Sequence, residues 1–203
     1  MYDDLIHVRT NNTDPRVDSA RQIIYEEIST DNHMKTWYTE NWFKAGSEPT
    51  KYEMGIDTET FKIGGSAAYI ASKETKIKGF GTLMQSCSAK DYLGKRIKMS
   101  GYVKSDEVKG WAGLWLRVDG TNGTKPLAMD NMGDRKIIGT TEWTEYHITL
   151  DVPSESTTLN FGALLDGTGK IWFDNITFTI VDNSTKTTGK CMILEKPMNL
   201  DFD

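Results

Sequence analysis

Most of the chain consists of short runs in which hydrophobic and polar residues alternate, separated by turn-forming glycine, aspartate, asparagine and lysine. Alternation with a period of two is typical of β-strands, because successive side chains point to opposite faces. Short strands with regular breaks and no helical pattern between them predict an antiparallel β-sandwich. We expect strands near residues 52–57, 67–72, 79–87, 96–104, 111–119, 126–132, 144–152, 158–165 and 170–181.

One helical pattern precedes this region. Asp14 is suited to cap a helix, and Pro15 is suited to its first position. Apolar residues then recur at spacings of three to four positions, at Val17, Ala20, Ile24 and Ile28. The sequence therefore predicts an all-β fold with one short N-terminal amphipathic helix, which either covers the sandwich or docks on a partner.

The pattern divides the chain into three parts: an N-terminal extension at 1–36, the β-sandwich at 37–182, and a polar linker with a strand-like tail at 183–203. In the tail, Leu200 and Phe202 alternate with polar residues. Such a strand seeks a sheet edge, either in its own chain or in a second copy. A homodimer formed through the C-terminal strand is therefore a possible partnership.

The expected strand at 111–119 has two different faces. Its apolar face, predicted to point into the core, carries Ala112, Leu114, Leu116 and Val118. Its other face carries Trp111, Gly113, Trp115, Arg117 and Asp119. Two tryptophans, an arginine and a carboxylate are unusual on a strand face that only meets solvent.

This set of side chains suits a carbohydrate ligand. An aromatic plane packs on the apolar CH face of a sugar ring, and arginine, aspartate and amide groups bind its hydroxyls. The predicted ligand-binding residues are Trp111, Trp115, Arg117, Tyr102, Gln85, Asp130 and Asn131. The alternative is that the tryptophans pack under a loop or the helix, with Arg117 paired structurally to Asp119 or Asp130.

Composition and charge argue against several other classes. The net charge is −5, from 24 basic and 29 acidic residues, and no long basic run is present, so we expect no nucleic-acid binding. No apolar run approaches the roughly 20 residues of a membrane helix, and the N-terminus lacks signal-peptide features, which predicts a cytoplasmic protein without membrane contact. The two cysteines and three histidines have no metal-site spacing, so no cofactor is expected.

A family resemblance supports the sandwich. The stretch 169–178, with Asp174 after an apolar run, resembles the closing strand of galactose-binding-like jelly rolls, which include many carbohydrate-binding modules. Together with the runs at 42–46, 79–85, 110–120 and 127–132, the chain resembles an accessory β-sandwich found downstream of AraC-type helix-turn-helix modules in Gram-positive regulators. The resemblance implies a jelly roll that senses a ligand or contacts protein.

The resemblance also implies a possible structural calcium ion near Asp174, although one matched carboxylate does not make a site. The alternative for Asp174 is a carboxylate that accepts hydrogen bonds from backbone amides at a bulge or turn. No helix-turn-helix module is present in this sequence, so DNA binding does not carry over.

We therefore expect a non-catalytic ligand-binding module, most simply for a saccharide. The alternative is a protein-interaction or regulatory domain without a small ligand. No motif singles out a carboxylate pair for glycoside hydrolysis.

Overall fold

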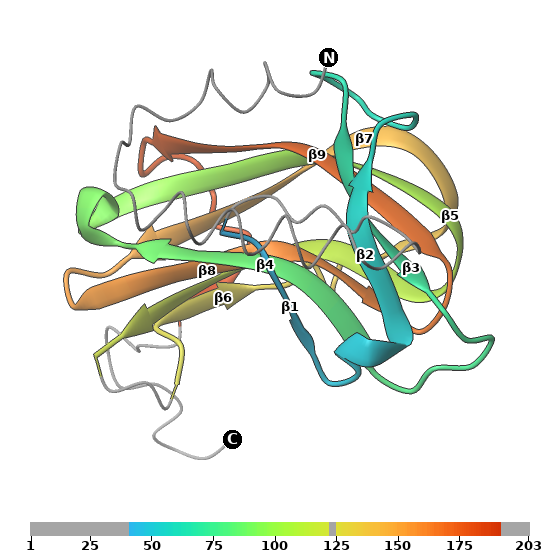
Figure 1. Ribbon diagram of the computed structural model, residues 1–203. Coiled ribbons are helices and arrows are strands. Elements are labelled where there is room, and N and C mark those ends of the chain that lie inside the picture. Colours follow the sequence, from blue (N-terminus) through green and yellow to red (C-terminus); the bar gives the residue numbers. More distant parts are fainter. Residues whose placement is uncertain (1–40, 122–124, 192–203) are drawn as a thin grey trace, which may run out of the picture. The chain divides into compact units, whose positions relative to one another are not determined.

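The structure is a computed structural model that describes residues 41–121 and 125–191 (Figure 1). The described residues form ten strands and two single-turn 3₁₀ helices, η1 (Pro49–Lys51) and η2 (Lys90–Tyr92). The strands are β1 (Phe43–Gly46), β2 (Tyr52–Asp57), β3 (Ala67–Ser72), β4 (Phe80–Ser88), β5 (Lys95–Gly120), β6 (Ala128–Asp130), β7 (Ile137–Val152), β8 (Ser156–Asp166), β9 (Lys170–Val181) and β10 (Lys190–Cys191). The expected N-terminal helix lies outside the described residues.

All strand pairs are antiparallel, and one long strand connects the two layers of the sandwich. The order is β1-β4-β8-β5-β9-β3-β2. The first half of β5 pairs with β7 and β9, whereas its second half pairs with β8 and β6. Register shifts against β7 between Val103 and Ala112 mark the bulged region where β5 passes from one layer to the other. Hence the expected strands at 96–104 and 111–119 are one strand.

We call the two layers by their central strands. The β8 layer contains β1, β4, β8, the second half of β5, β6 and β10. The β9 layer contains β2, β3, β9, the first half of β5 and β7. In Figure 1, β4 and β8 lie side by side with β1 at their edge, as their pairing requires.

The core fills the space between the two layers. Phe161 of β8 meets Phe178 of β9 at a ring-centroid distance of 4.8 Å. Trp42 lies 5.7 Å from both Phe161 and Phe173 and so also joins the layers. The hydroxyl of Tyr52 lies 2.9 Å from two main-chain carbonyl oxygens, and burial raises its pKa to about 12.

The strand predictions are confirmed in type and nearly in extent. The strands at 52–57, 67–72 and 170–181 begin and end where the alternation predicts. The short edge strand β1 was not among the expected strands, and β7 begins at Ile137, before the predicted start. The all-β class and the antiparallel sandwich are therefore correct.

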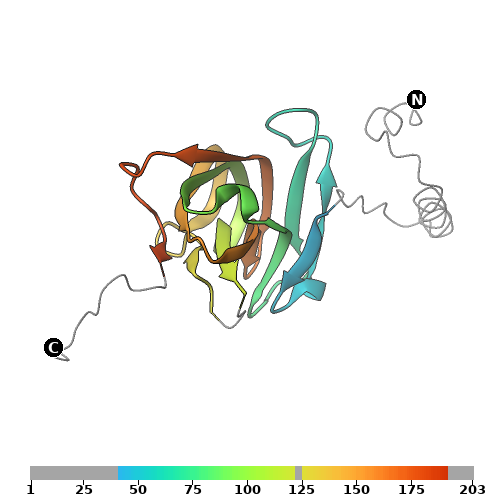
Figure 2. The same ribbon diagram turned by 90° about the vertical axis from the view of Figure 1, so that its left-hand side faces the viewer.

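Residues 183–191 are held against the sandwich. The amide of Thr188 donates to the carbonyl of Thr149, and the amide of Thr149 donates to the Thr188 hydroxyl, both at 2.9 Å. Arg96 donates to the carbonyls of Asn183 and Thr185. Strand β10 then pairs with β6 at one edge of the β8 layer (Figure 2). The polarity of this stretch suggested a linker, but these contacts fix it along β7 and β6.

The expected tail strand, with Leu200 and Phe202, lies outside the described residues. In the parts of the chain that the structure describes, no helix combines the length and the apolar character needed to cross a bilayer.

Candidate functional site

The outward face of the β8 layer gathers three of the residues expected to bind a ligand. On β5, Trp111 stands opposite Asp166, Trp115 opposite Gly162, and Arg117 opposite Asn160. Directly opposed residues of antiparallel strands point to the same face. The intervening residues of β5 are fully buried in the core, so Trp111, Trp115 and Arg117 all lie on the outward side.

The buried indole of Trp115 lies at the base of this face, and we call it the floor. Its side chain is only 8% exposed, and its Nε1 donates to the hydroxyl of Thr82 on β4 at 2.8 Å. The indole therefore reaches across β8, where Gly162 presents no side chain in its path. Thr82 in turn donates to the carbonyl of Ala163 at 2.7 Å. These buried hydrogen bonds fix the ring in one orientation.

Beside this floor, four polar side chains form a connected row across three strands. We call Ser86, Asn160, Arg117 and Asp119 the polar row. Arg117 Nε donates to Asp119 Oδ2 at 2.9 Å, and Asn160 Nδ2 donates to the same oxygen at 2.6 Å. Ser86 donates to Asn160 Oδ1. Each side chain is hydrogen-bonded to another member of the row, so the row is ordered before any ligand binds.

The polar row keeps groups available at the surface. The side chains of Arg117 and Asp119 are 43% and 19% exposed. Within the described residues, Arg117 Nη1 and Asp119 Oδ1 have no hydrogen-bond partner. One donor and one acceptor are thus open to solvent on a fixed frame.

Two aromatic side chains flank the polar row and the floor. Trp111 is half-buried, and Lys136 Nζ lies 5.3 Å from its ring centroid. Phe43 of β1 is 46% exposed and stands opposite Met84 of β4, which itself stands opposite Gly162. Phe43 was not among the expected site residues. Its strand is only four residues long, so alternation alone does not reveal which face it occupies.

The structure separates Asp130 from this face. Asp130 stands opposite the core residue Leu116 and is buried. Its Oδ2 pairs with Arg135 Nη2 at 2.7 Å, and its Oδ1 accepts the Met132 amide at 2.8 Å. Burial raises the pKa of the Asp130 carboxyl, but the hydrogen bonds from Arg135, Thr188 and the Met132 amide outweigh burial, so its pKa is lowered overall. Asp130 ties the β6–β7 connection to the sandwich.

Three other expected residues also lie apart from Trp115. Gln85 stands opposite Phe161 and so takes the core-facing side of β4. Asn131 lies in the β6–β7 connection, where its Oδ1 accepts the Gly133 amide at 3.1 Å. Tyr102 belongs to the β9 layer, where Lys62 Nζ lies 5.2 Å from its ring centroid. The seven expected residues therefore do not share one face, because their placement depends on the crossover of β5 and on which side of β4 Gln85 takes.

The Asp174 carboxylate accepts hydrogen bonds from three backbone amides and so fixes the main chain around it. Its Oδ2 accepts the amides of Lys62 and Ile63 at 2.9 and 2.8 Å, and its Oδ1 accepts the amide of Asn175 at 2.7 Å. Asn175 has a φ of 53°, which marks a bulge in β9. Across residues 41–121 and 125–191, no three His, Cys, Asp or Glu side chains are grouped as a metal site requires. The geometry agrees with the bulge-carboxylate alternative.

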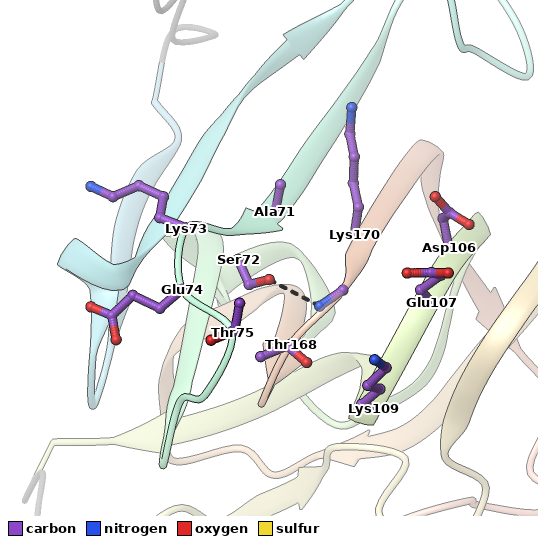
Figure 3. Close-up of a pocket in the computed structure, with 11 residues that line it drawn as sticks. Ala71, Ser72, Lys73, Glu74, Thr75, Asp106, Glu107, Lys109, Thr168 and Lys170 are labelled. Carbon is purple, nitrogen blue, oxygen red and sulfur yellow. Dashed lines mark hydrogen bonds between the residues drawn. The ribbon is translucent and has the colours of Figure 1, made fainter.

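A pocket of about 390 Å³ lies elsewhere, at one end of the sandwich (Figure 3). It is lined by the end of β3 and the following turn, the bulged part of β5, and the β8–β9 turn. No aromatic side chain lines it. A sugar ring therefore has no stacking partner there, in contrast to the outward face of the β8 layer.

Comparison with known proteins gives one relative in sequence. No family model matches the chain. The chain is 41% identical over 166 residues to a Bacillus subtilis (strain 168) protein named "Uncharacterized HTH-type transcriptional regulator YbfP". The match covers 80% of this chain and 56% of the relative, so the chain spans little more than half of the relative's length.

Solved structures share the fold at low sequence identity. The enzymatically active domain of bacteriophage CBA120 tailspike protein 4 has a TM-score of 0.54 at 10% identity, over 70% of this chain and 20% of that one. The CBM22-1–GH10 modules of Clostridium thermocellum xylanase 10B, complexed with xylohexaose, give 0.51 at 14% identity, over 72% and 27%. A family 16 carbohydrate-binding module gives 0.50 at 11% identity, over 66% and 89%.

At these identities the structural likeness shows the fold alone. The sequence match connects the chain to a protein named as a helix-turn-helix-type regulator. Both parts of the expected resemblance, to the fold and to a regulator, are thus confirmed. This chain has the jelly-roll β-sandwich fold found in carbohydrate-binding modules, and it resembles part of a transcriptional regulator in sequence.

Proposed function

We propose that this chain is a non-catalytic saccharide-binding module and that its ligand lies on the outward face of the β8 layer. The observation that carries the proposal is the polar row, held across three strands beside the buried Trp115 and flanked by the aromatic side chains of Trp111 and Phe43.

The chemistry of the polar row matches sugar hydroxyls. Arg117 Nη1 offers a charged donor, and Asp119 Oδ1 offers a charged acceptor. Hydrogen bonds to charged groups are roughly twice as strong as neutral ones. A hydroxyl both donates and accepts, so two hydroxyls of one sugar can engage both atoms. Because the row is already ordered, binding costs little side-chain entropy.

The size of the face favours more than one sugar ring. Phe43, Met84, Gly162 and Trp115 form one row across β1, β4, β8 and β5. Three strand spacings separate the ends of this row, which is about 14 Å. Phe43 and the polar row can therefore contact different units of one oligosaccharide.

The comparisons support this proposal. The fold is one on which carbohydrate-binding modules are built, and one such structure is described as complexed with xylohexaose. The sequence relative is named as a regulator, which favours sensing of a saccharide over its turnover. A cytoplasmic location, the absence of a catalytic role and a homodimer remain predictions.

A saccharide screen with matched variants tests the proposal. The complete chain is screened on a glycan array, and hits are titrated by calorimetry. We expect Arg117→Met and Asp119→Asn each to weaken binding about tenfold, equivalent to about 1.4 kcal/mol. Glu142→Gln is the control, because Glu142 forms an exposed ion pair with Lys104 in the β9 layer.

Two results would count against the proposal. One is a saccharide that binds the Arg117 and Asp119 variants as well as the original chain. The other is no binding on a broad array together with a stable oligomer in sedimentation, which would favour the protein-interaction alternative. Trp115→Ala is unsuitable as the primary test, because this buried ring supports the sheet.

A further inference from the structure

The pocket at the end of the sandwich has chemistry that saccharide binding does not use. Its lining contains three lysines and three acidic residues and no aromatic ring. The charged residues are Lys73, Glu74, Asp106, Glu107, Lys109 and Lys170. Figure 3 shows Lys73, Glu74 and Thr75 on one side and Asp106, Glu107 and Lys109 of β5 on the other. A volume of about 390 Å³ lies within the range of small-molecule sites.

Three hydrogen bonds, two of them between main-chain groups, make the frame of the pocket rigid. Ser72 and Gly169 are joined twice: the Ser72 amide donates to the Gly169 carbonyl at 2.9 Å, and the Gly169 amide donates to the Ser72 hydroxyl at 3.0 Å. The Lys109 amide donates to the Thr168 carbonyl at 2.9 Å. These bonds join all three segments that form the pocket, so its shape exists before a ligand binds.

One wall carries backbone strain. Glu107 has a φ of 48°, in the left-handed region that residues other than glycine seldom adopt. The strain coincides with the register shift of β5 against β7, and the Glu107 amide is held by the Thr140 hydroxyl at 3.0 Å. Such strain persists where the surrounding structure enforces it, and it is concentrated at functional sites.

Four of the six charged groups are available. Lys170 is occupied by Asp57 and by the rings of Tyr69 and Trp172, and Asp106 accepts from Thr140. By contrast, the charged ends of Lys73, Glu74, Glu107 and Lys109 have no ion-pair or hydrogen-bond partner among the described residues. Figure 3 shows the Lys73 and Glu74 side chains directed away from the opposite wall, so the unpaired charges beside the pocket are the Lys109 ammonium and the Glu107 carboxylate.

The balance of charge selects the class of ligand. A purely anionic or cationic ligand would meet as many like charges as opposite ones. A molecule with both a carboxylate and an ammonium group can satisfy both signs at once. From the pocket, its rigid frame and its unpaired charges, we infer that this is a second binding site, which takes a small zwitterion: an α-amino acid or a short peptide with both ends free.

Amide chemical shifts of the complete ¹⁵N-labelled chain test this inference. Glycine and glycylglycine are the zwitterionic probes, and which binds more tightly separates the free amino acid from the peptide. N-acetylglycine retains only the carboxylate, glycinamide retains only the ammonium group, and methyl glucoside has neither charge. We expect saturable shifts at 72–75, 106–109 and 168–170 with a zwitterionic probe and much weaker shifts with the other three.

Variants localise the effect. Lys109→Gln and Glu107→Gln each remove one exposed charge contact and should weaken binding about two- to fivefold. Lys98→Gln is the control, since Lys98 lies on β5 outside the pocket. The inference is overturned if no probe shifts the pocket amides, if single-charge probes or the glucoside bind as well as the zwitterions, or if all three variants behave alike.

Discussion

Replacing Trp115 by phenylalanine tests the structural role of this residue. The indole is 8% exposed and donates to Thr82 at 2.8 Å. Phenylalanine keeps the six-membered ring but loses this hydrogen bond, which is worth about 1 kcal/mol. The vacated volume adds about another 1 kcal/mol. We therefore expect Trp115→Phe to lower the free energy of unfolding by about 2 kcal/mol.

A double-mutant cycle isolates the hydrogen bond. Thr82→Val leaves the buried indole N–H without a partner and should cost about 2–3 kcal/mol. In the double variant no N–H remains to be satisfied, so its cost should fall below the sum of the two single costs by about 1 kcal/mol. Urea unfolding, followed by fluorescence and by circular dichroism, measures all four proteins. A Trp115→Phe cost below about 0.5 kcal/mol, or no coupling, would refute the floor assignment.

Other substitutions test the remaining structural assignments. Asp130→Asn should lower the free energy of unfolding by about 2–3 kcal/mol at pH 7, because Arg135 loses its carboxylate; a difference below 0.5 kcal/mol in urea melts would contradict this. The pKa of Asp130 is lowered in the folded chain, so its stabilisation is present above about pH 4 and lost as pH falls through the folded pKa, and the two proteins should converge in acid. Gly162→Ala should cost more than about 1.5 kcal/mol, because a Cβ there would collide with the Leu83 carbonyl; an unchanged melting temperature would argue otherwise. Asp174→Ala should speed amide hydrogen exchange in the β2–β3 connection without depending on calcium; a calcium-dependent melting temperature in the original chain would instead support a metal site.

The sandwich could be predicted because its strands follow the simplest rule. Alternation in 52–57, 67–72 and 170–181 reflects one buried and one exposed face, which depends only on local sequence. The path of β5 could not be predicted in the same way. Its crossover depends on register shifts between Val103 and Ala112, and these arise from pairing with distant strands.

The candidate site was predictable in part for the same reason. Trp111, Trp115 and Arg117 share one strand, so their common face follows from alternation. Asp130 lies on β6 and Tyr102 on the first half of β5, and their placement depends on which layer each segment joins. The polar row depends on the pairing of β8 with both β5 and β4, which sets Asn160 between Arg117 and Ser86.

Mapping a bound saccharide by amide chemical shifts tests the central proposal most directly. Titrating the best array hit into the ¹⁵N-labelled chain should shift amides of the polar row and its neighbours on β4, β5 and β8, and Asp119→Asn should reduce these shifts. Saturable shifts confined to the β9 layer, around Tyr102, or to the end of the sandwich would contradict a saccharide site on the outward face of the β8 layer.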